Sequence, residues 1–89
     1  MGKVEAFSIP GVEMWFWSAD HIPPHFHVKK VGEWEIRVHI LETRERALSY
    51  ELKWGAGPNG KLQGALATLV VKHREALYDE WCRKTGVED

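Results

Sequence analysis

Apolar and polar side chains alternate along three segments of the chain, residues 25–30, 34–40 and 48–54. Side chains two positions apart lie on the same face of a strand, so each segment is predicted to be a strand with one buried face. Short connections between the segments predict an antiparallel meander. The apolar sets are Phe26 and Val28; Trp34, Ile36, Val38 and Ile40; and Leu48, Tyr50, Leu52 and Trp54.

An earlier segment, residues 12–19, is apolar on both sides, which predicts a strand that is central or covered on both faces. After it, Pro23 and Pro24 break the strand pattern. The isomer of each proline peptide bond cannot be read from the sequence.

The C-terminal third has its apolar residues at helical spacing, which predicts one helix from Lys61 to about Lys84. Asn59 is suited to cap its start, and Gly86 to end it. The predicted fold class is α+β, a four-stranded antiparallel meander with one long C-terminal helix packed on one face. Residues 1–89 are expected to form a single domain with an ordered core at about 9–84. The helical stripe consists of Leu62, Leu66, Leu69, Val70, Leu77 and Trp81.

Composition narrows the class of protein. The chain has 89 residues, of which 44% are hydrophobic, and this is too apolar for a disordered chain. Twelve basic and 13 acidic residues give a net charge of −1, which excludes a generally basic surface that wraps nucleic acid. The single cysteine, Cys82, excludes an internal disulfide and fits a cytoplasmic location. We expect no signal peptide and no membrane span.

The pairing of residues 25–30 with 34–40 determines which polar side chains meet. The apolar residues of the two strands share one face only if the residue numbers of each cross-strand pair add up to an even value. A three-residue turn between the strands makes this sum 64. This register places Lys29 opposite Glu35, a pair of complementary charge. The face away from the helix is then predicted to carry His25, His27, Arg37 and His39, with Asp20 and His21 at its edge.

Three interpretations of this histidine face remain open. The first is a divalent transition-metal site with ligands among His21, His25, His27 and His39, supported by Asp20. A neighbouring arginine disfavours it, because one cation repels another. The second is acid–base chemistry on a phosphodiester such as RNA, with His25 and His27 (and His39) transferring protons and Arg37 stabilising negative charge.

The third interpretation is structural, with the histidines serving as cross-strand neighbours or partner contacts. Trp15 and Trp17, if uncovered, would form an apolar patch for a partner protein, and a homodimer is compatible with the same pattern. A catalytic domain should place its histidines in a concave pocket, whereas an interaction module should expose tryptophan or an unpaired strand edge.

Residues 20–28, Asp-His-Ile-Pro-Pro-His-Phe-His-Val, resemble the signature of a small bacterial family, domain of unknown function 4160. Leu77 and Trp81 resemble the family's late Leu and Trp. The resemblance implies a bacterial domain encoded beside a second small protein, in a pair similar to toxin–antitoxin modules. We therefore expect a module that binds this partner protein, with a small hydrolase or ribonuclease as the alternative.

Overall fold

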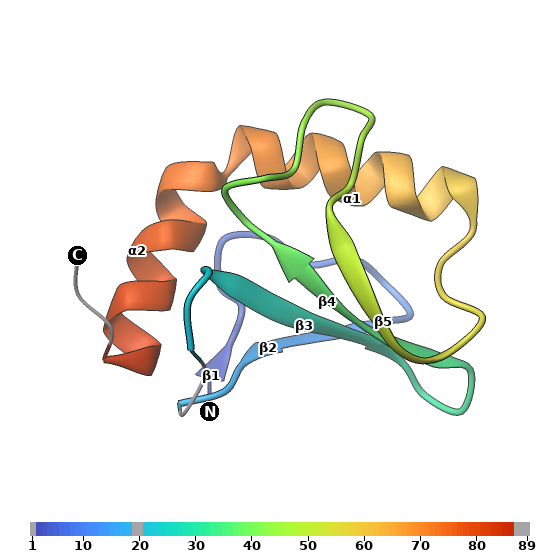
Figure 1. Ribbon diagram of the computed structural model, residues 1–89, viewed down its shortest axis with the longest axis horizontal. Coiled ribbons are helices and arrows are strands. Elements are labelled where there is room, and N and C mark those ends of the chain that lie inside the picture. The colour runs from blue at the N-terminus through green and yellow to red at the C-terminus, as the bar shows by residue number, and fades with distance from the viewer. Residues whose placement is uncertain (1, 19–20, 87–89) are drawn as a thin grey trace.

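The computed structural model describes residues 2–18 and 21–86. Its strands form one antiparallel sheet in the order β1-β2-β3-β4-β5 (Figure 1). The predicted α+β class with an antiparallel sheet is therefore confirmed, but the predicted number of four strands is wrong. The additional strand β1 pairs with Trp15 and Phe16 of β2, and at two residues it is too short to show alternation. The strands are β1 (Gly2–Lys3), β2 (Glu13–Phe16), β3 (His25–Lys30), β4 (Trp34–His39) and β5 (Tyr50–Gly55).

The C-terminal segment forms two helices, α1 (Gly60–Lys72) and α2 (Arg74–Thr85), so the prediction of one long helix is wrong. The chain bends at His73, whose ring stacks on Phe7 at a centroid distance of 5.5 Å. Helical hydrogen bonds continue on both sides of the bend, and for this reason the apolar spacing looks uninterrupted in the sequence. Neither of these two helices is both long and apolar enough to span a membrane.

The helix termini carry the predicted capping residues. The Asn59 side chain accepts a hydrogen bond from the backbone N–H of Leu62 at 2.9 Å. Gly86 ends α2 in the left-handed conformation, which costs glycine little because it has no Cβ. In Figure 1, α1 passes over the sheet and α2 turns away at its end, beside the first residues of β3.

The core lies between one sheet face and the two helices. The predicted apolar faces of residues 25–30 and 34–40 are buried there, together with much of the helical stripe. The alternating burial of β4 confirms the predicted parity of that strand. The buried core residues are Val4, Met14, Phe16, Phe26, Val28, Trp34, Ile36, Val38, Ile40, Leu66, Val70, Leu77 and Trp81.

Strand β5 differs from its prediction because its apolar residues do not share one buried face. A β-bulge opposite Glu35 and Ile36 shifts the register, so that Leu52 pairs with Ile36 but Trp54 pairs with Glu35. One extra residue reverses the parity, and this places Trp54 on the polar face. Leu52 is 51% exposed and Trp54 is 43% exposed, so the end of β5 contributes little to the core.

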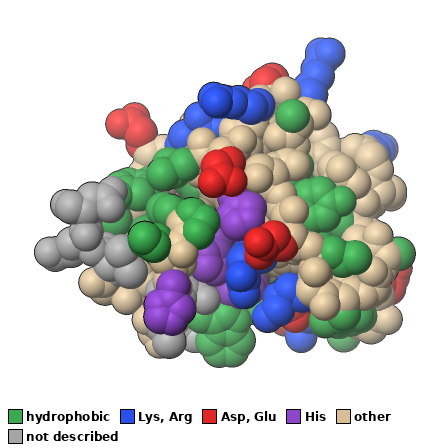
Figure 2. All heavy atoms as spheres, in the orientation of Figure 1, with side chains coloured by type: hydrophobic (Ala, Val, Ile, Leu, Met, Phe, Trp, Pro, Cys, Tyr) green, Lys and Arg blue, Asp and Glu red, His purple; other side chains and the backbone are tan. Residues whose placement is uncertain are grey.

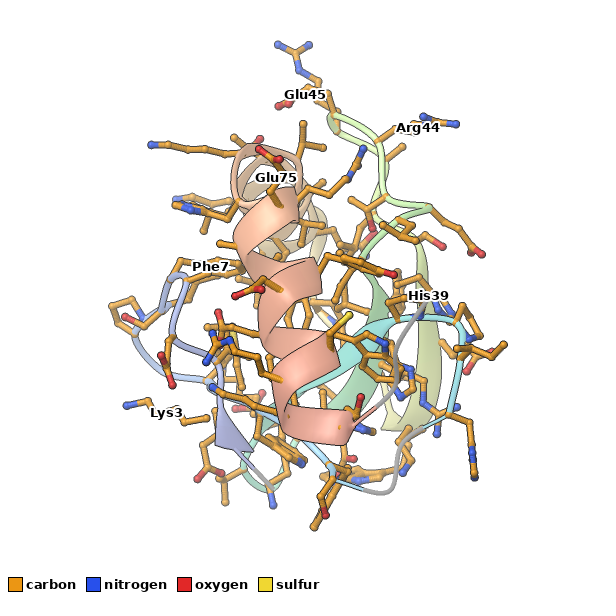
Figure 3. The ribbon with its side chains drawn as sticks, turned by 90° about the vertical axis from the view of Figure 1, so that its left-hand side faces the viewer. Lys3, Phe7, His39, Arg44, Glu45 and Glu75 are labelled. Carbon is orange, nitrogen blue, oxygen red and sulfur yellow. The ribbon has the colours of Figure 1, made fainter. Side chains whose placement is uncertain are left out.

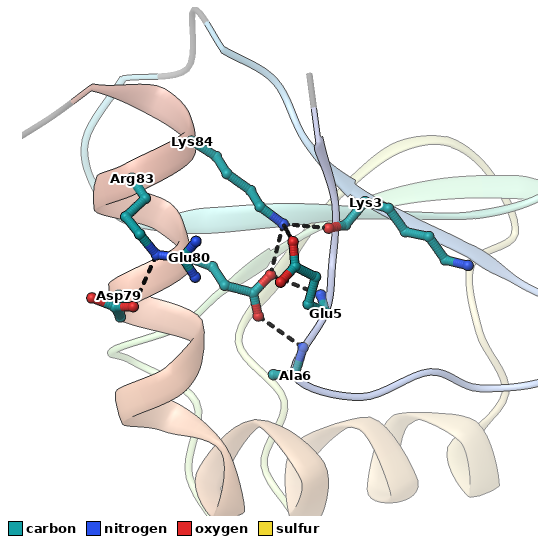
Figure 4. Close-up of polar contacts among 7 residues, drawn as sticks. All are labelled: Lys3, Glu5, Ala6, Asp79, Glu80, Arg83 and Lys84. Atoms are coloured by element: carbon teal, nitrogen blue, oxygen red, sulfur yellow. Dashed lines mark hydrogen bonds and ion pairs between the residues drawn. The ribbon is translucent and has the colours of Figure 1, made fainter.

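A buried carboxylate attaches α2 to the N-terminal segment (Figure 4). Glu80 accepts hydrogen bonds from the backbone N–H groups of Glu5 and Ala6 at 2.7 and 2.8 Å. The Lys84 ammonium lies 3.0 Å from carboxylate oxygens of both Glu80 and Glu5. The hydrogen bond from Lys84 lowers the pKa of Glu5. Burial opposes the charge of Lys84, but its bonds to Glu5 and Glu80 outweigh this and raise its pKa.

Candidate functional site

The histidines come together through the pairing of β3 with β4. His25 pairs with His39, His27 with Arg37, and Lys29 with Glu35, so the predicted register is confirmed. The ring centroid of His25 lies 5.3 Å from that of His27 and 6.4 Å from that of His39. The three imidazoles therefore form one cluster on this face of the sheet.

His25 is buried at the first position of β3, next to the two prolines. Its Nδ1 lies 2.8 Å from the carbonyl oxygen of Pro23. A carbonyl oxygen can only accept, so Nδ1 donates this hydrogen bond. The peptide bond between Ile22 and Pro23 is cis.

The histidine face is not wholly separate from the helices, contrary to the expectation that it lies away from them. The ring of His25 contacts Trp81 of α2 at a centroid distance of 5.2 Å. Figure 3 shows α2 running between Phe7 on one side and His39 on the other. The bend at His73 brings α2 to this end of the sheet, and this is why a helix residue reaches the histidine cluster.

His27 is buried beneath two tryptophans. Its ring is stacked on Trp15 at 5.4 Å and meets the edge of Trp17 at 6.3 Å. Its Nδ1 lies 3.9 Å from an oxygen of Glu35. His27 thus belongs to an aromatic stack, whereas His25 and His39 border a cavity.

A cavity of about 340 Å³ opens beside His25. On the face drawn in Figure 2, histidine side chains lie in the middle, next to basic and acidic ones. The carboxylate of Glu51 contacts two other cavity residues. One of its oxygens lies 3.2 Å from Arg37 Nη1, and the other lies 3.9 Å from His39 Nε2. These pairs are partly exposed, so each contributes at most about 1 kcal/mol. The lining residues are His21, Ile22, Pro23, His25, Arg37, His39, Glu42 and Glu51.

The metal interpretation gains no support from this geometry. Within residues 2–18 and 21–86, no three His, Cys, Asp or Glu side chains are placed to hold one metal ion. His21 is exposed at the cavity rim, and Asp20 lies outside the described residues. Nδ1 of His25 is already occupied by the Pro23 carbonyl, and Arg37 adds positive charge beside the cluster.

A comparison with known protein families matches residues 11–82 to the description "Domain of unknown function (DUF4160)". The chain belongs to this family. The matched region includes the motif at residues 20–28 and ends in α2, one residue beyond Trp81. No curated protein and no solved structure matches the chain.

A second and larger hollow of the DUF4160 domain, about 760 Å³, lies at the β1–β2 side of the sheet. Trp15 and Trp17 both line it, and Trp17 is 44% exposed. The ammonium of Lys29 lies 5.9 Å from the Trp15 ring centroid, a cation–π contact. We call this hollow the tryptophan groove. Its lining residues are Gly2, Lys3, Val4, Ser8, Ile9, Pro10, Gly11, Val12, Glu13, Met14, Trp15, Trp17 and Lys29.

Sequence reasoning missed Glu42 and a second acidic residue of the cavity, Glu51. Glu51 pairs with Arg37 because residue numbers sum to 88 along this part of β4 and β5. The even-sum rule that was used for the earlier strand pair, if extended to this one, would have placed Glu51 on the same face as Arg37. The sequence carries no comparable signal for the contact between His25 and Trp81, which depends on the bend between the helices.

Proposed function

We propose that this DUF4160 domain is an interaction module that binds a small partner protein encoded by a neighbouring gene, in a pair similar to a toxin–antitoxin module. The tryptophan groove is the binding surface. The observation that carries the proposal is the partly exposed Trp17 at the edge of a hollow large enough for several side chains. Exposed tryptophans at the rim of a pocket are typical anchors of protein interfaces.

The groove also indicates what kind of segment would fit. Ile9, Val12 and the two tryptophan rings offer apolar surface, and two lysines, Lys3 and Lys29, line it against one glutamate. An apolar segment of the partner with an acidic residue beside it would satisfy both features. Trp15 is held by its stack on His27, so it would present a fixed surface, whereas Trp17 would supply most of the newly buried area.

We expect Trp17→Ala to weaken binding to the neighbouring gene product by at least about tenfold, because the substitution removes an interface anchor. Trp54→Ala is the matched control, since Trp54 is equally exposed but lies on β5, at the opposite edge of the sheet. Co-expression and co-purification, followed by titration calorimetry, measure the effect. Failure of the wild-type protein to associate at micromolar concentration, or equal losses in both variants, would contradict the proposal.

A second candidate function is acid–base cleavage of a phosphodiester in the cavity beside His25. This function is favoured by the proximity of the His25 and His39 rings in the cavity. Arg37 lies beside them on β4, the strand between β3 and β5. His25 and His39 would act as the proton-transfer pair, and Arg37 would stabilise the anionic phosphate. His27, which the sequence suggested for this role, lies in the aromatic stack and would act only through its neighbours.

We expect cleavage of an RNA oligonucleotide by tag-free protein to show a bell-shaped pH profile if this second function holds. His39→Gln should then lower the rate by about 10²-fold or more, because one proton-transfer group is lost. Lys30→Gln, at the other end of β3, should leave the rate unchanged. Absence of cleavage, or an unchanged rate in His39→Gln, would remove this candidate.

A further inference from the structure

The outer edge of β5 is the second exposed edge of the sheet. In the described part of the chain β5 is the last strand in the order, with β4 as its one neighbour. The His39 N–H donates to the Ser49 carbonyl at 2.9 Å, and Arg37 and Glu51 pair in the same register. Hydrogen-bonded and non-hydrogen-bonded pairs alternate along an antiparallel ladder, so Glu51 directs its backbone groups toward β4. Tyr50 and Leu52 therefore direct theirs outward, away from β4.

Exposed side chains accompany this edge. Leu52 and Trp54 are both large, apolar and about half exposed. Proteins usually protect edge strands with charge, proline or a covering segment, because an open edge recruits other strands. On β5 the charged residues are Glu51 and Lys53, of opposite sign and two positions apart. Such a strand is complementary to a second copy of itself.

We propose that β5 pairs antiparallel with β5 of a second copy of this chain, about a two-fold axis at Leu52. In a two-fold dimer that keeps the helices of both copies on the same side of the joined sheet, the residue numbers of each cross-strand pair add up to an even value. An axis at Glu51 would place two glutamates opposite each other, which is destabilising. An axis at Leu52 places Glu51 opposite Lys53 of the second copy, twice by symmetry, and charge complementarity selects this register.

The same axis satisfies the backbone and the apolar residues. Leu52 of each copy lies opposite the other, with its outward N–H and C=O forming a hydrogen-bonded pair. The two Leu52 side chains lie next to each other across the axis, whereas Tyr50 packs against the core and Trp54 lies on the polar face, so these two rings do not meet. The bulge after Leu52 ends the regular ladder, so the new pairing is short and centred on Leu52. The tryptophan groove at the other edge of the sheet stays open, so this self-association does not depend on the proposed partner.

Cysteine cross-linking tests the register directly. In the proposed dimer the two Cα atoms of position 52 lie about 5.5 Å apart, within the range that a disulfide spans. Leu52→Cys should therefore form a disulfide-linked dimer under mild oxidation, and mass spectrometry should identify the peptide pair linked through position 52 of both copies. Glu51→Cys is the matched control and should not link through position 51. Linkage through position 51 and not 52, or a wild-type protein that is monomeric by light scattering at millimolar concentration, would overturn the proposal.

Charge exchange provides a second test. Glu51→Lys and Lys53→Glu should each weaken the dimer by at least about tenfold, because each places like charges opposite each other. The double variant Glu51→Lys/Lys53→Glu restores the complementarity and should recover dimerisation, as measured by sedimentation equilibrium. Recovery cannot arise from the contact of Glu51 with Arg37 within one chain, which the double variant still lacks. Continued loss in the double variant would contradict the Leu52 axis.

Discussion

Replacing Trp81 with alanine is expected to destabilise the fold by about 3–5 kcal/mol, the cost typical of deleting a large aromatic side chain from a core. Trp81 is almost completely buried, and its ring lies between the helix layer and the His25 ring. Its loss would leave a cavity where α2 meets the sheet. Small domains have only about 5–15 kcal/mol of total stability, so much of the protein would unfold under mild conditions.

Urea denaturation followed by circular dichroism measures this effect. Trp54→Ala removes a side chain of the same type at a position that is exposed in a single chain, so at concentrations where the protein is monomeric it should change the free energy of unfolding by no more than about 0.5 kcal/mol. A loss below about 1 kcal/mol in Trp81→Ala would mean that the contact between α2 and the histidine cluster is not part of the folded core.

Replacing Glu80 with alanine is the substitution with the second largest expected effect, a loss of about 3 kcal/mol. The variant leaves two backbone N–H groups, of Glu5 and Ala6, without their acceptor and removes a carboxylate partner of Lys84. Each buried donor that loses its partner costs about 1–3 kcal/mol. The N-terminal segment that carries β1 should then lose protection from amide hydrogen exchange before the rest of the sheet.

Asp79 offers a close control for Glu80. Asp79 and Arg83 form an ion pair with the same i,i+4 spacing and the same 3.0 Å distance as Glu80 and Lys84. The Asp79 side chain is 70% exposed, whereas that of Glu80 is 3% exposed. Asp79→Ala should therefore cost only about 0.3–0.5 kcal/mol. Equal losses in the two variants would show that the buried bonds of Glu80 to the N-terminal backbone contribute nothing.

The correctly predicted part of the fold depends on two features of the sequence, the period with which apolar residues recur and the parity of the cross-strand pairs. Alternation in residues 25–30 and 34–40, with a three-residue turn, was sufficient to give the correct cross-strand pairs. The histidine cluster followed from those pairs, because a strand's side-chain period is fixed at two. The family resemblance rested on nine consecutive residues, and a match over residues 11–82 confirms it.

The parts that were missed depend on contacts distant in sequence. A bulge in β5 inserts one residue without any local signal, and it moved Trp54 to the other face. At the bend His73 stacks on Phe7, which lies near the N-terminus, and the bend brings Trp81 to His25. Burial of His27 beneath Trp15 and Trp17 likewise follows from the packing of β2 on β3. The periodicity of apolar residues along the chain cannot predict the bulge, the bend or the burial of His27.

The two edges of the sheet have separate proposed roles. The β1–β2 side carries the tryptophan groove for a different protein, and β5 carries a self-complementary edge. A dimer through β5 would display two tryptophan grooves, and a bivalent arrangement of this kind increases the avidity for a partner that is itself dimeric. The cavity beside His25 lies on the sheet face between these edges.

The tryptophan indole N–H signals provide the most direct test of partner binding at Trp17. The chain has five tryptophans, so a nitrogen–proton correlation spectrum resolves each indole separately. During titration with the neighbouring gene product, we expect large shifts for the indole signals of Trp15 and Trp17 and none for those of Trp34, Trp54 and Trp81. Shifts confined to Trp54, or a spectrum that does not change at saturating partner concentration, would contradict partner binding at Trp17.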